Sequence, residues 1–276
     1  MTTKNTFLTI TNDIEFFDDI EEFKKNAFND IDIVVNNKKI KYYNVACSFD
    51  IETTSFYENN EKRACMYLWS FAFNHCVVFG RRWIEYIKLM NYISDKLELD
   101  ENNRIICYVH NLAFEFQFLS KRFEWIKVFA TEARKPLFAV TNTGIEYRCS
   151  YLLSGYSLSK VAENLKTHQI KKLTGDLDYK LLRHSQTTIT SKELRYSVYD
   201  VIIIMYYIDE LIAEEHNDIS RIPLTKTGYV RRYVRNYVYY NNKKHKNNKQ
   251  YTRYRNYIKS LTIDVDEYKQ LIRAFA

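Results

Sequence analysis

The chain has 276 residues and a formal net charge of +7, and 46% of its residues are hydrophobic. This length suits one large domain or one domain with a smaller one, and the hydrophobic content excludes a chain that is disordered overall. Its five cysteines include no Cys-x-x-Cys pair, which favours reduced thiols over disulfides or zinc. With no apparent signal peptide, and no apolar run longer than residues 201–208, we expect a cytoplasmic protein without a membrane partner.

Residues 1–40 form a polar N-terminal extension with one short helix near residues 18–28. Apolar runs predict strands at residues 42–52, 63–74, 75–79, 104–109, 125–131, 137–143 and 145–151. Helical spacing of apolar residues predicts helices at residues 83–97, 110–119 and 158–165. A capping box, Thr190-x-x-Glu193, opens a long helix to about Glu215. The alternation of strand and helix predicts an α/β domain over residues 41–220, with a mixed central sheet flanked by helices.

The positive charge is concentrated in the C-terminal region, residues 221–276. Between Arg221 and Lys259 there are 12 Lys or Arg and no acid, so 29 basic residues face 34 acidic ones elsewhere. A predicted helix in this region carries Arg231, Arg232 and Arg235 beside an apolar stripe. Because basic groups bind phosphates, we expect these arginines to contact nucleic acid. The alternative is a solvated helical surface.

Two carboxylates stand at the end of the first predicted core strand. Asp50 and Glu52 are two residues apart, so they point to the same face, while Ile51 points into the core. Two neighbouring acids repel each other unless a cation lies between them, and oxygen ligands suit Mg²⁺ or Mn²⁺. The pair is therefore a candidate half of a metal site. The alternative is a solvated strand end.

Two further acids are candidates for the other half. Glu115 follows a buried strand and lies among aromatic and aliphatic residues of a predicted helix. Asp200 precedes a strongly apolar run, where an unpaired acid is costly, and it shares a helix face with Tyr196. The alternatives are a boundary glutamate at Glu115 and an ion pair of Asp200 with Arg195.

Together, the four acids have the composition of a two-metal centre. Four carboxylates can hold two divalent ions about 3.5–4 Å apart, an arrangement used to cleave phosphodiesters. Tyr196 is too weak an acid to serve as a base near neutral pH, so we expect its hydroxyl to orient the attacking water.

Three motifs resemble the 3′–5′ proofreading exonuclease domain of family B DNA polymerases, in particular the protein-primed phage and linear-plasmid branch. Phe49-Asp-Ile-Glu-Thr-Thr54 resembles the first exonuclease motif, and Tyr196-x-x-x-Asp200 resembles the third, in its tyrosine subclass. Tyr108-x-His-Asn-Leu-x-Phe-Glu-x-x-Phe118 resembles the second. Residues 174–179 also resemble a stretch of that branch, and the whole match spans about residues 42–215.

The resemblance implies an RNase H-like (DnaQ-like) exonuclease fold, two Mg²⁺ or Mn²⁺ ions, and a single-stranded or frayed DNA 3′ end as substrate. It also implies a polymerase domain in the same or a separate chain, a terminal protein as partner, and the host-cell cytoplasm as location if a phage encodes the chain. The residues that it assigns to DNA contacts are Thr53, Tyr108, His110, Asn111, Phe114, Phe118, Ser157, Leu158 and Tyr179.

Two positions depart from the family pattern. The family usually has Asp where this chain has Glu115, and it has a catalytic Lys where this chain has Thr174. Lys171 and Lys172 are nearby cations, but neither is in register. Two alternative functions therefore stay open: a catalytically weak module that binds single-stranded DNA on an exonuclease fold, and an exoribonuclease of the same superfamily.

Overall fold

The computed structural model describes residues 13–173, 181–235, 256–257 and 260. The chain divides into two units, residues 1–226 and residues 227–276. This boundary lies six residues beyond the one expected from the sequence at residue 220. The first unit contains all the strands of the described chain and the helices that cover them.

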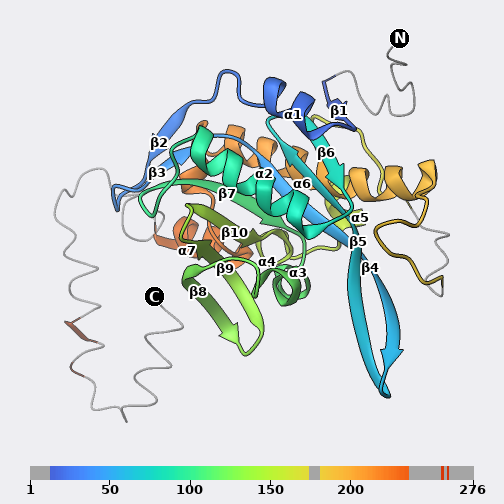
Figure 1. Ribbon diagram of the computed structural model, residues 1–276. Helices are drawn as coiled ribbons and strands as arrows, with labels where there is room; N and C mark the ends of the chain where they lie inside the picture. Colours follow the sequence, from blue (N-terminus) through green and yellow to red (C-terminus); the bar gives the residue numbers. More distant parts are fainter. Residues whose placement is uncertain (1–12, 174–180, 236–255, 258–259, 261–276) are drawn as a thin grey trace. The chain divides into compact units, whose positions relative to one another are not determined.

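The first unit is built on a mixed ten-stranded sheet (Figure 1). The order of its main path is β1 (Glu15–Phe17), β6 (Cys76–Gly80), β5 (Glu61–Phe73), β4 (Cys47–Glu58), β7 (Asn103–Val109), β10 (Ile145–Cys149), β9 (Lys135–Thr141) and β8 (Trp125–Glu132). Two short strands, β2 (Ile33–Val35) and β3 (Lys41–Tyr43), join it through β3 and β7. The β4–β7–β10 centre is parallel, whereas β4–β5–β6 and β8–β9–β10 are antiparallel.

Helices cover both faces of the sheet at its centre. Ser48 and Phe49 are neighbours on β4, so their side chains point to opposite faces. The Phe49 ring stacks on Tyr86 of α2 (Trp83–Lys96), with ring centroids 4.2 Å apart. The Ser48 hydroxyl donates a hydrogen bond to the backbone oxygen of Val201 on α6 (Ser191–Glu214). The expected mixed sheet flanked by helices is thereby confirmed.

The remaining helices of the described chain are short: α1 (Ile20–Asn26), α3 (Leu112–Leu119), α4 (Ser150–Ser154), α5 (Leu158–Glu163), the 3-10 turn η1 (Ile219–Arg221) and α7 (Lys226–Arg235). The capping box at α6 is present, because Thr190 Oγ1 accepts from Glu193 N at 3.2 Å and Glu193 Oε2 accepts from Thr190 N at 2.9 Å. None of the helices in the described part of the chain is long and apolar enough to cross a membrane.

Two expectations from the sequence differ from the structure. Residues 13–40 belong to the sheet unit and are no separate extension, since β1 pairs with β6 and the buried Phe23 packs its ring against Phe71. The strand expected at residues 42–52 is two strands, β3 and β4. β3 pairs with the first residues of β7 and ends at Tyr43, and β4 begins at Cys47 and pairs with the end of β7.

Candidate active site

The acids of β4 lie on the face of the sheet that α6 covers. Asp50 and Glu52 follow Ser48 at intervals of two, so all three side chains share that face, and Ile51 is buried on the other. The pairing of β4 with β5 shifts register between Glu52 and Thr53, which is a β-bulge. Bulges bend a strand and re-aim its side chains. Beyond the bulge the two strands continue together as a projecting hairpin (Figure 1).

Two serine contacts hold α6 against the acid-bearing strand. Ser48 Oγ lies 2.7 Å from the backbone oxygen of Val201, and the hydroxyls of Ser70 and Ser197 lie 2.7 Å apart. Ser70 is the register partner of Asp50 across β4 and β5. Since residues 197, 200 and 201 share one face of a helix, these contacts direct Asp200 toward β4.

The parallel pairing of β4 with β7 positions the fourth acid, Glu115. Ser48 pairs with Tyr108, so the carboxyl end of β7 lies beside Asp50. The chain then turns through Asn111, whose φ of 72° is left-handed, and enters α3. Glu115 in the first turn of α3 is only 4% exposed. The structure thus brings the side chains of β4, α3 and α6 to one place.

The pKa values show that the four carboxyl groups act on one another, and we call them the acid cluster. Burial, and then repulsion by Glu52, Asp200 and Glu115, holds the pKa of Asp50 well above its ordinary value. Burial and repulsion by Asp200 raise the pKa of Glu52 to about 7. Burial, with repulsion by Glu52, raises the pKa of Glu115 to about 8. Burial also raises the pKa of Asp200.

One cation lies within this cluster. Lys172 Nζ is 2.5 Å from Asp200 Oδ2 and 4.9 Å from the ring centroid of Tyr196. Its charge opposes the upward pKa shifts of Asp50, Glu52 and Asp200. Burial and the same charge lower the pKa of His110 to about 4. Lys172 is out of register with the catalytic Lys of the family motif, yet its ammonium group lies beside Asp200 and Tyr196 and close enough to His110 to affect its pKa.

The acid cluster keeps unsatisfied acceptors. Glu115 Oε2 and Asp200 Oδ1 are buried without a hydrogen-bond partner in the described chain. A buried charged oxygen without a donor or cation is costly, so both atoms are suited to a ligand that supplies positive charge. As the side chains stand, no three His, Cys, Asp or Glu residues of the described segments are grouped closely enough to hold a metal ion.

Several residues assigned to DNA contacts lie beside the acid cluster. Thr53 is half-buried and directly follows the bulge. His110 Nδ1 is 3.1 Å from Ser150 Oγ. Asn111 is exposed, and the 37% exposed ring of Phe114 lies 5.4 Å from that of Phe118. These side chains form a mixed aromatic and amide surface next to Glu115.

Other assigned residues lie elsewhere. Tyr108 is 1% exposed and Leu158 is buried, so neither is accessible to a DNA strand in this structure, since both fill the interior. The Ser157 hydroxyl caps α5 by accepting from Lys160 N. Tyr179 lies outside the described residues.

Arg231 and Arg232 are on α7 and belong to the second unit, whereas the acid cluster belongs to the first. The Arg235 side chain is outside the described part. The same helix exposes Val230, Tyr233 and Val234.

A buried ion pair that no sequence motif indicates borders the acids. Arg183 Nε lies 2.5 Å from Glu193 Oε1, and both residues act on the pKa of Glu52. The Arg183 backbone N–H also donates to Thr54 Oγ1, which ties this segment to β4 just past the bulge. No motif indicates the serines of β4, β5 and α6 either. Their only signal in the sequence is a small polar residue within an otherwise apolar run.

Comparisons with known proteins give the fold. No protein-family model matches the chain, and no curated protein matches it by sequence. Among solved structures, phi29 DNA polymerase with primer-template DNA and incoming nucleotides matches with a TM-score of 0.54 at 16% identity. The match covers 72% of this chain and 35% of that one. Phi29 DNA polymerase with single-stranded DNA matches with a TM-score of 0.52 at 17% identity, over 72% and 36% of the two chains. This chain therefore spans about a third of the polymerase that it resembles, and it shares the fold of that part.

Proposed function

We propose that this chain is a metal-dependent 3′–5′ exonuclease of RNase H-like (DnaQ-like) fold and tyrosine subclass, which removes nucleotides from single-stranded or frayed DNA 3′ ends. The observation that carries the proposal is the acid cluster. Four carboxyl groups from β4, α3 and α6 have pKa values raised by burial, repulsion by the others raises the pKa of Asp50 further, and two of the groups keep buried oxygens without partners. A protein retains such an arrangement at a cost in stability, which is typical of a catalytic site.

The fold and the sequence motifs support the same proposal. The fold match is to phi29 DNA polymerase, which has been solved with primer-template DNA and with single-stranded DNA. The three motifs that resemble proofreading exonucleases contain the residues of the acid cluster. We extend the proposal to the context of the chain: a polymerase domain of protein-primed type in the same or a separate chain, a terminal protein as partner, and a phage host's cytoplasm as location.

Asp50, Glu52, Glu115 and Asp200 are the residues that would hold two Mg²⁺ or Mn²⁺ ions. All their donor atoms are carboxylate oxygens, which these ions prefer, and the unpartnered oxygens of Glu115 and Asp200 supply free ligands. Because these side chains are not yet grouped as a ligand shell, binding would require them to turn toward one another. When bound, two such ions would lower the pKa of water and stabilise negative charge on the leaving oxygen.

The chain's own residues would position the substrate around this centre. The Tyr196 hydroxyl would orient the attacking water, since its proton is too tightly held near neutral pH for it to act as a base. Lys172, placed against Asp200, would stabilise negative charge on the phosphate. Asn111 can hydrogen-bond the sugar or phosphate, and the Phe114 ring can stack on a base without choosing sequence.

A specific observation favours one alternative, a module that binds single-stranded DNA without cutting it. Lys172 forms an ion pair with Asp200, and this pair competes with a metal ion for a ligand. The binding module predicts DNA affinity that persists in an Asp50→Asn variant and no change in substrate length. The exoribonuclease alternative predicts faster trimming of RNA than of DNA, since the 2′-hydroxyl separates the two.

Incubation of the purified chain with a 5′-labelled oligodeoxynucleotide and Mg²⁺ or Mn²⁺ at low salt tests the proposal. We expect the label to move to progressively shorter products, with no trimming in EDTA or by the Asp50→Asn variant. Full-length substrate under both metals would refute the enzyme and leave the binding module. A parallel RNA oligonucleotide measures the preference for DNA.

A further inference from the structure

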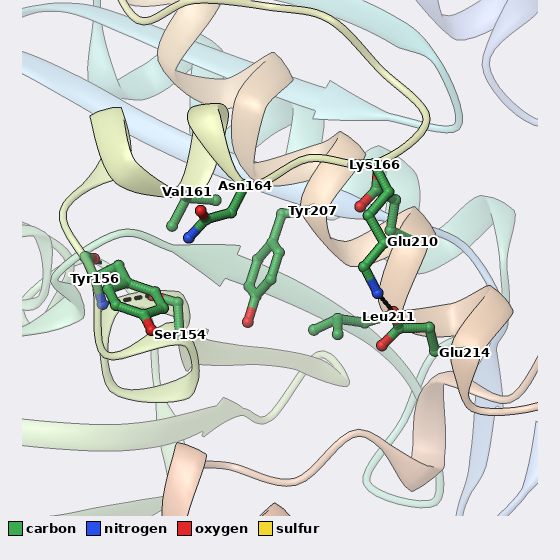
Figure 2. A pocket seen from close by; sticks show the side chains of 9 residues that line it. All are labelled: Ser154, Tyr156, Val161, Asn164, Lys166, Tyr207, Glu210, Leu211 and Glu214. Atoms are coloured by element: carbon green, nitrogen blue, oxygen red, sulfur yellow. Dashed lines mark hydrogen bonds and ion pairs between the residues drawn. The ribbon is translucent and has the colours of Figure 1, made fainter.

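A pocket of about 170 Å³ lies in the first unit, away from the acid cluster. It is formed by the end of α4, the α5 helix with its flanking loops, and the C-terminal half of α6. Figure 2 shows Tyr156 and Ser154 on one side, Lys166 and Glu214 on the other, and the Tyr207 ring between them. An apolar cavity of about 150 Å³ takes up benzene. The pocket therefore has room for one base-sized ring system and is too small for a whole nucleotide.

The walls combine flat, apolar and hydrogen-bonding groups. The rings of Tyr156 and Tyr207 and the side chains of Val161 and Leu211 offer contacts to the faces of a ring. Neither the Asn164 amide nor the Tyr207 hydroxyl has a hydrogen-bond partner within residues 13–173 and 181–235, so both can serve the polar edge of a ligand. An amide offers a donor and an acceptor side by side, as the hydrogen-bonding edge of a base requires.

The two ends of the pocket differ in charge. Lys226 Nζ donates to the Tyr156 hydroxyl at 3.3 Å and lies 4.3 Å from its ring centroid, so an ammonium group stands at that end. At the opposite end the Glu214 carboxylate is paired with Lys166. Glu210 Oε1 accepts from Lys166 N, Thr167 N and Thr167 Oγ1. A phosphate is therefore attracted to the Tyr156 end, with the ring pointing inward.

The position of the pocket relates it to the acid cluster. Tyr207 follows Asp200 by seven residues on α6, which is two helical turns, so both side chains lie on the same face about 10 Å apart along the axis. Stacked nucleotides rise 3.4 Å each along a strand, so this separation corresponds to about three nucleotides.

We propose that this pocket holds one base of the single strand whose 3′ end lies at the acid cluster, about three nucleotides upstream of the terminal one. The inference rests on the proposed function for the position of the 3′ end. The ligand chemistry is a nucleobase, with its phosphate near Lys226. Stacking of a base on aromatic side chains contributes about 1–3 kcal/mol without sequence preference. The pocket therefore fixes how far the strand extends into the site.

The test is a scan with an abasic nucleotide moved one position at a time from the 3′ end of a fluorescent oligodeoxynucleotide. Binding is measured by anisotropy in EDTA, so that no cleavage occurs. We expect one upstream position, about three nucleotides from the end, at which loss of the base weakens binding about fivefold or more, as expected from about 1 kcal/mol of lost stacking. A scan in which upstream positions all behave alike overturns the inference without any variant.

Two substitutions attribute the effect to the pocket. Asn164→Trp fills the pocket from an exposed position, and we expect it to abolish the sensitivity to the abasic position. Ile84→Trp adds the same ring to an exposed position on α2, across the sheet, and should leave the sensitivity intact. If Asn164→Trp fails to fold, Tyr156→Ala replaces it as the test. Tyr156 is on an exposed loop, and we expect its loss to reduce the sensitivity to the abasic position. An unchanged scan in the folded Asn164→Trp variant would overturn the assignment.

Two parallel arms separate the outcomes. Deoxycytidine monophosphate presents a base without a strand, and its selective displacement of the abasic-sensitive binding would show that the pocket takes a free nucleotide, against the inference. Trimming of the same oligonucleotide in Mn²⁺ is measured alongside. Trimming with a flat abasic scan refutes the pocket and keeps the exonuclease. A position-dependent scan without trimming refutes the exonuclease and keeps the base site.

Discussion

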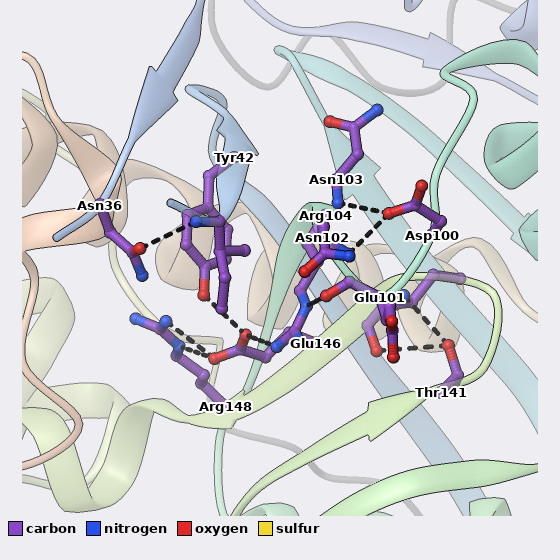
Figure 3. Close-up of polar contacts among 12 residues, drawn as sticks. Asn36, Tyr42, Asp100, Glu101, Asn102, Asn103, Arg104, Thr141, Glu146 and Arg148 are labelled. Carbon is purple, nitrogen blue, oxygen red and sulfur yellow. Dashed lines mark hydrogen bonds and ion pairs between the residues drawn. The ribbon is translucent and has the colours of Figure 1, made fainter. Parts of the chain in front are cut away.

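Two groups of buried carboxylates in the first unit differ in how their charge is balanced. Figure 3 shows the Glu146 network, in which Tyr42, Arg104 and Arg148 surround the Glu146 carboxylate. Glu146 Oε1 accepts from Arg148 Nε at 2.8 Å, and Oε2 accepts from Arg104 Nη1 at 3.1 Å and from the Tyr42 hydroxyl at 3.0 Å. Burial alone would raise the pKa of Glu146, but Arg148 and Arg104 outweigh it and lower this pKa.

The acid cluster has four carboxyl groups. In the described residues, the cations that lower their pKa values are Lys172, which acts on three of them, and Arg183, which acts on Glu52 and is itself paired with Glu193. Its pKa values rise where that of Glu146 falls, and it keeps unpartnered oxygens where Glu146 keeps none. A carboxylate whose charge is balanced inside the protein contributes to the fold. A carboxylate whose charge is left unbalanced is suited to a cation from outside, which is the basis of the proposed nuclease centre.

The largest expected effect comes from removing the charge of the balanced group. Glu146→Gln leaves Arg104 and Arg148 buried without a counter-charge, so we expect the free energy of unfolding at neutral pH to fall by about 3–5 kcal/mol. Urea unfolding measures it, and Glu101→Gln on the exposed neighbouring turn is the control. A loss no greater than that of the control would show that the network contributes nothing to stability.

The pH dependence of this effect has a definite sign. Because the folded-state pKa of Glu146 is lowered, its contribution is present above the ordinary value of 4.5 and is lost as pH falls through the folded-state value. The stabilities of the wild type and Glu146→Gln should therefore converge in acid. A difference that stays constant from neutral pH into acid would contradict the assignment.

Next in size is the loss of an unbalanced acid. Asp200→Asn should reduce 3′ trimming by more than about 100-fold, since even groups that only support metal ligands cost 10- to 100-fold when lost. Asp209→Asn, nine residues later on α6, removes another acid whose pKa burial raises to about 7 and should leave trimming unchanged. Equal trimming rates in the two variants would remove Asp200 from the site.

Lys172 should contribute less than a metal ligand. We expect Lys172→Gln to slow trimming about tenfold, because it supports the phosphate and Asp200 without holding an ion. Lys171→Gln changes the exposed neighbour and should have no effect. Lys172→Arg keeps the charge and should restore part of the rate. If Lys172→Arg trims no faster than Lys172→Gln, the role of this residue is not electrostatic.

The smallest expected effect is a gain in stability at the acid cluster. The pKa of Glu115 is raised from 4.5 to about 8, so its contribution to stability is full below 4.5 and is lost as pH rises through about 8. Without divalent ions, Glu115→Gln should increase the free energy of unfolding at pH 8 and leave it unchanged below 4.5. Urea unfolding at both ends of this range measures it, and a loss of stability at alkaline pH would contradict the account.

The sequence predicts much of the fold because apolar spacing reports burial. The sequence alone shows the apolar runs of β5 and β7 and the capping box of α6. The structure has each of these elements where the pattern predicts it. The break between β3 and β4 leaves no such signal, since Val45 and Ala46 are apolar and buried although they belong to neither strand. Residues 13–40 look polar, yet Phe23 and Ala27 belong to the core, and Phe17, Ile20, Phe28 and Ile31 pack against it.

The candidate site is predictable where a residue is conspicuous in its own surroundings. An acid inside an apolar run, as at Glu115 or Asp200, stands out in the sequence. The role of Ser48 depends on Val201, which lies 153 residues away, and no local pattern reports that contact. The same holds for Lys172, because only the fold brings it to Asp200. Tyr108 shows the converse, since a motif residue assigned to DNA lies in the interior.

The central claim is that Asp50, Glu52, Glu115 and Asp200 together bind divalent cations, and Mn²⁺ binding followed by electron paramagnetic resonance tests it most directly. The account predicts two bound Mn²⁺ ions per chain, strongly reduced binding in Asp50→Asn, and unchanged binding in Asp209→Asn. Wild-type binding no stronger than that of Asp50→Asn would contradict it.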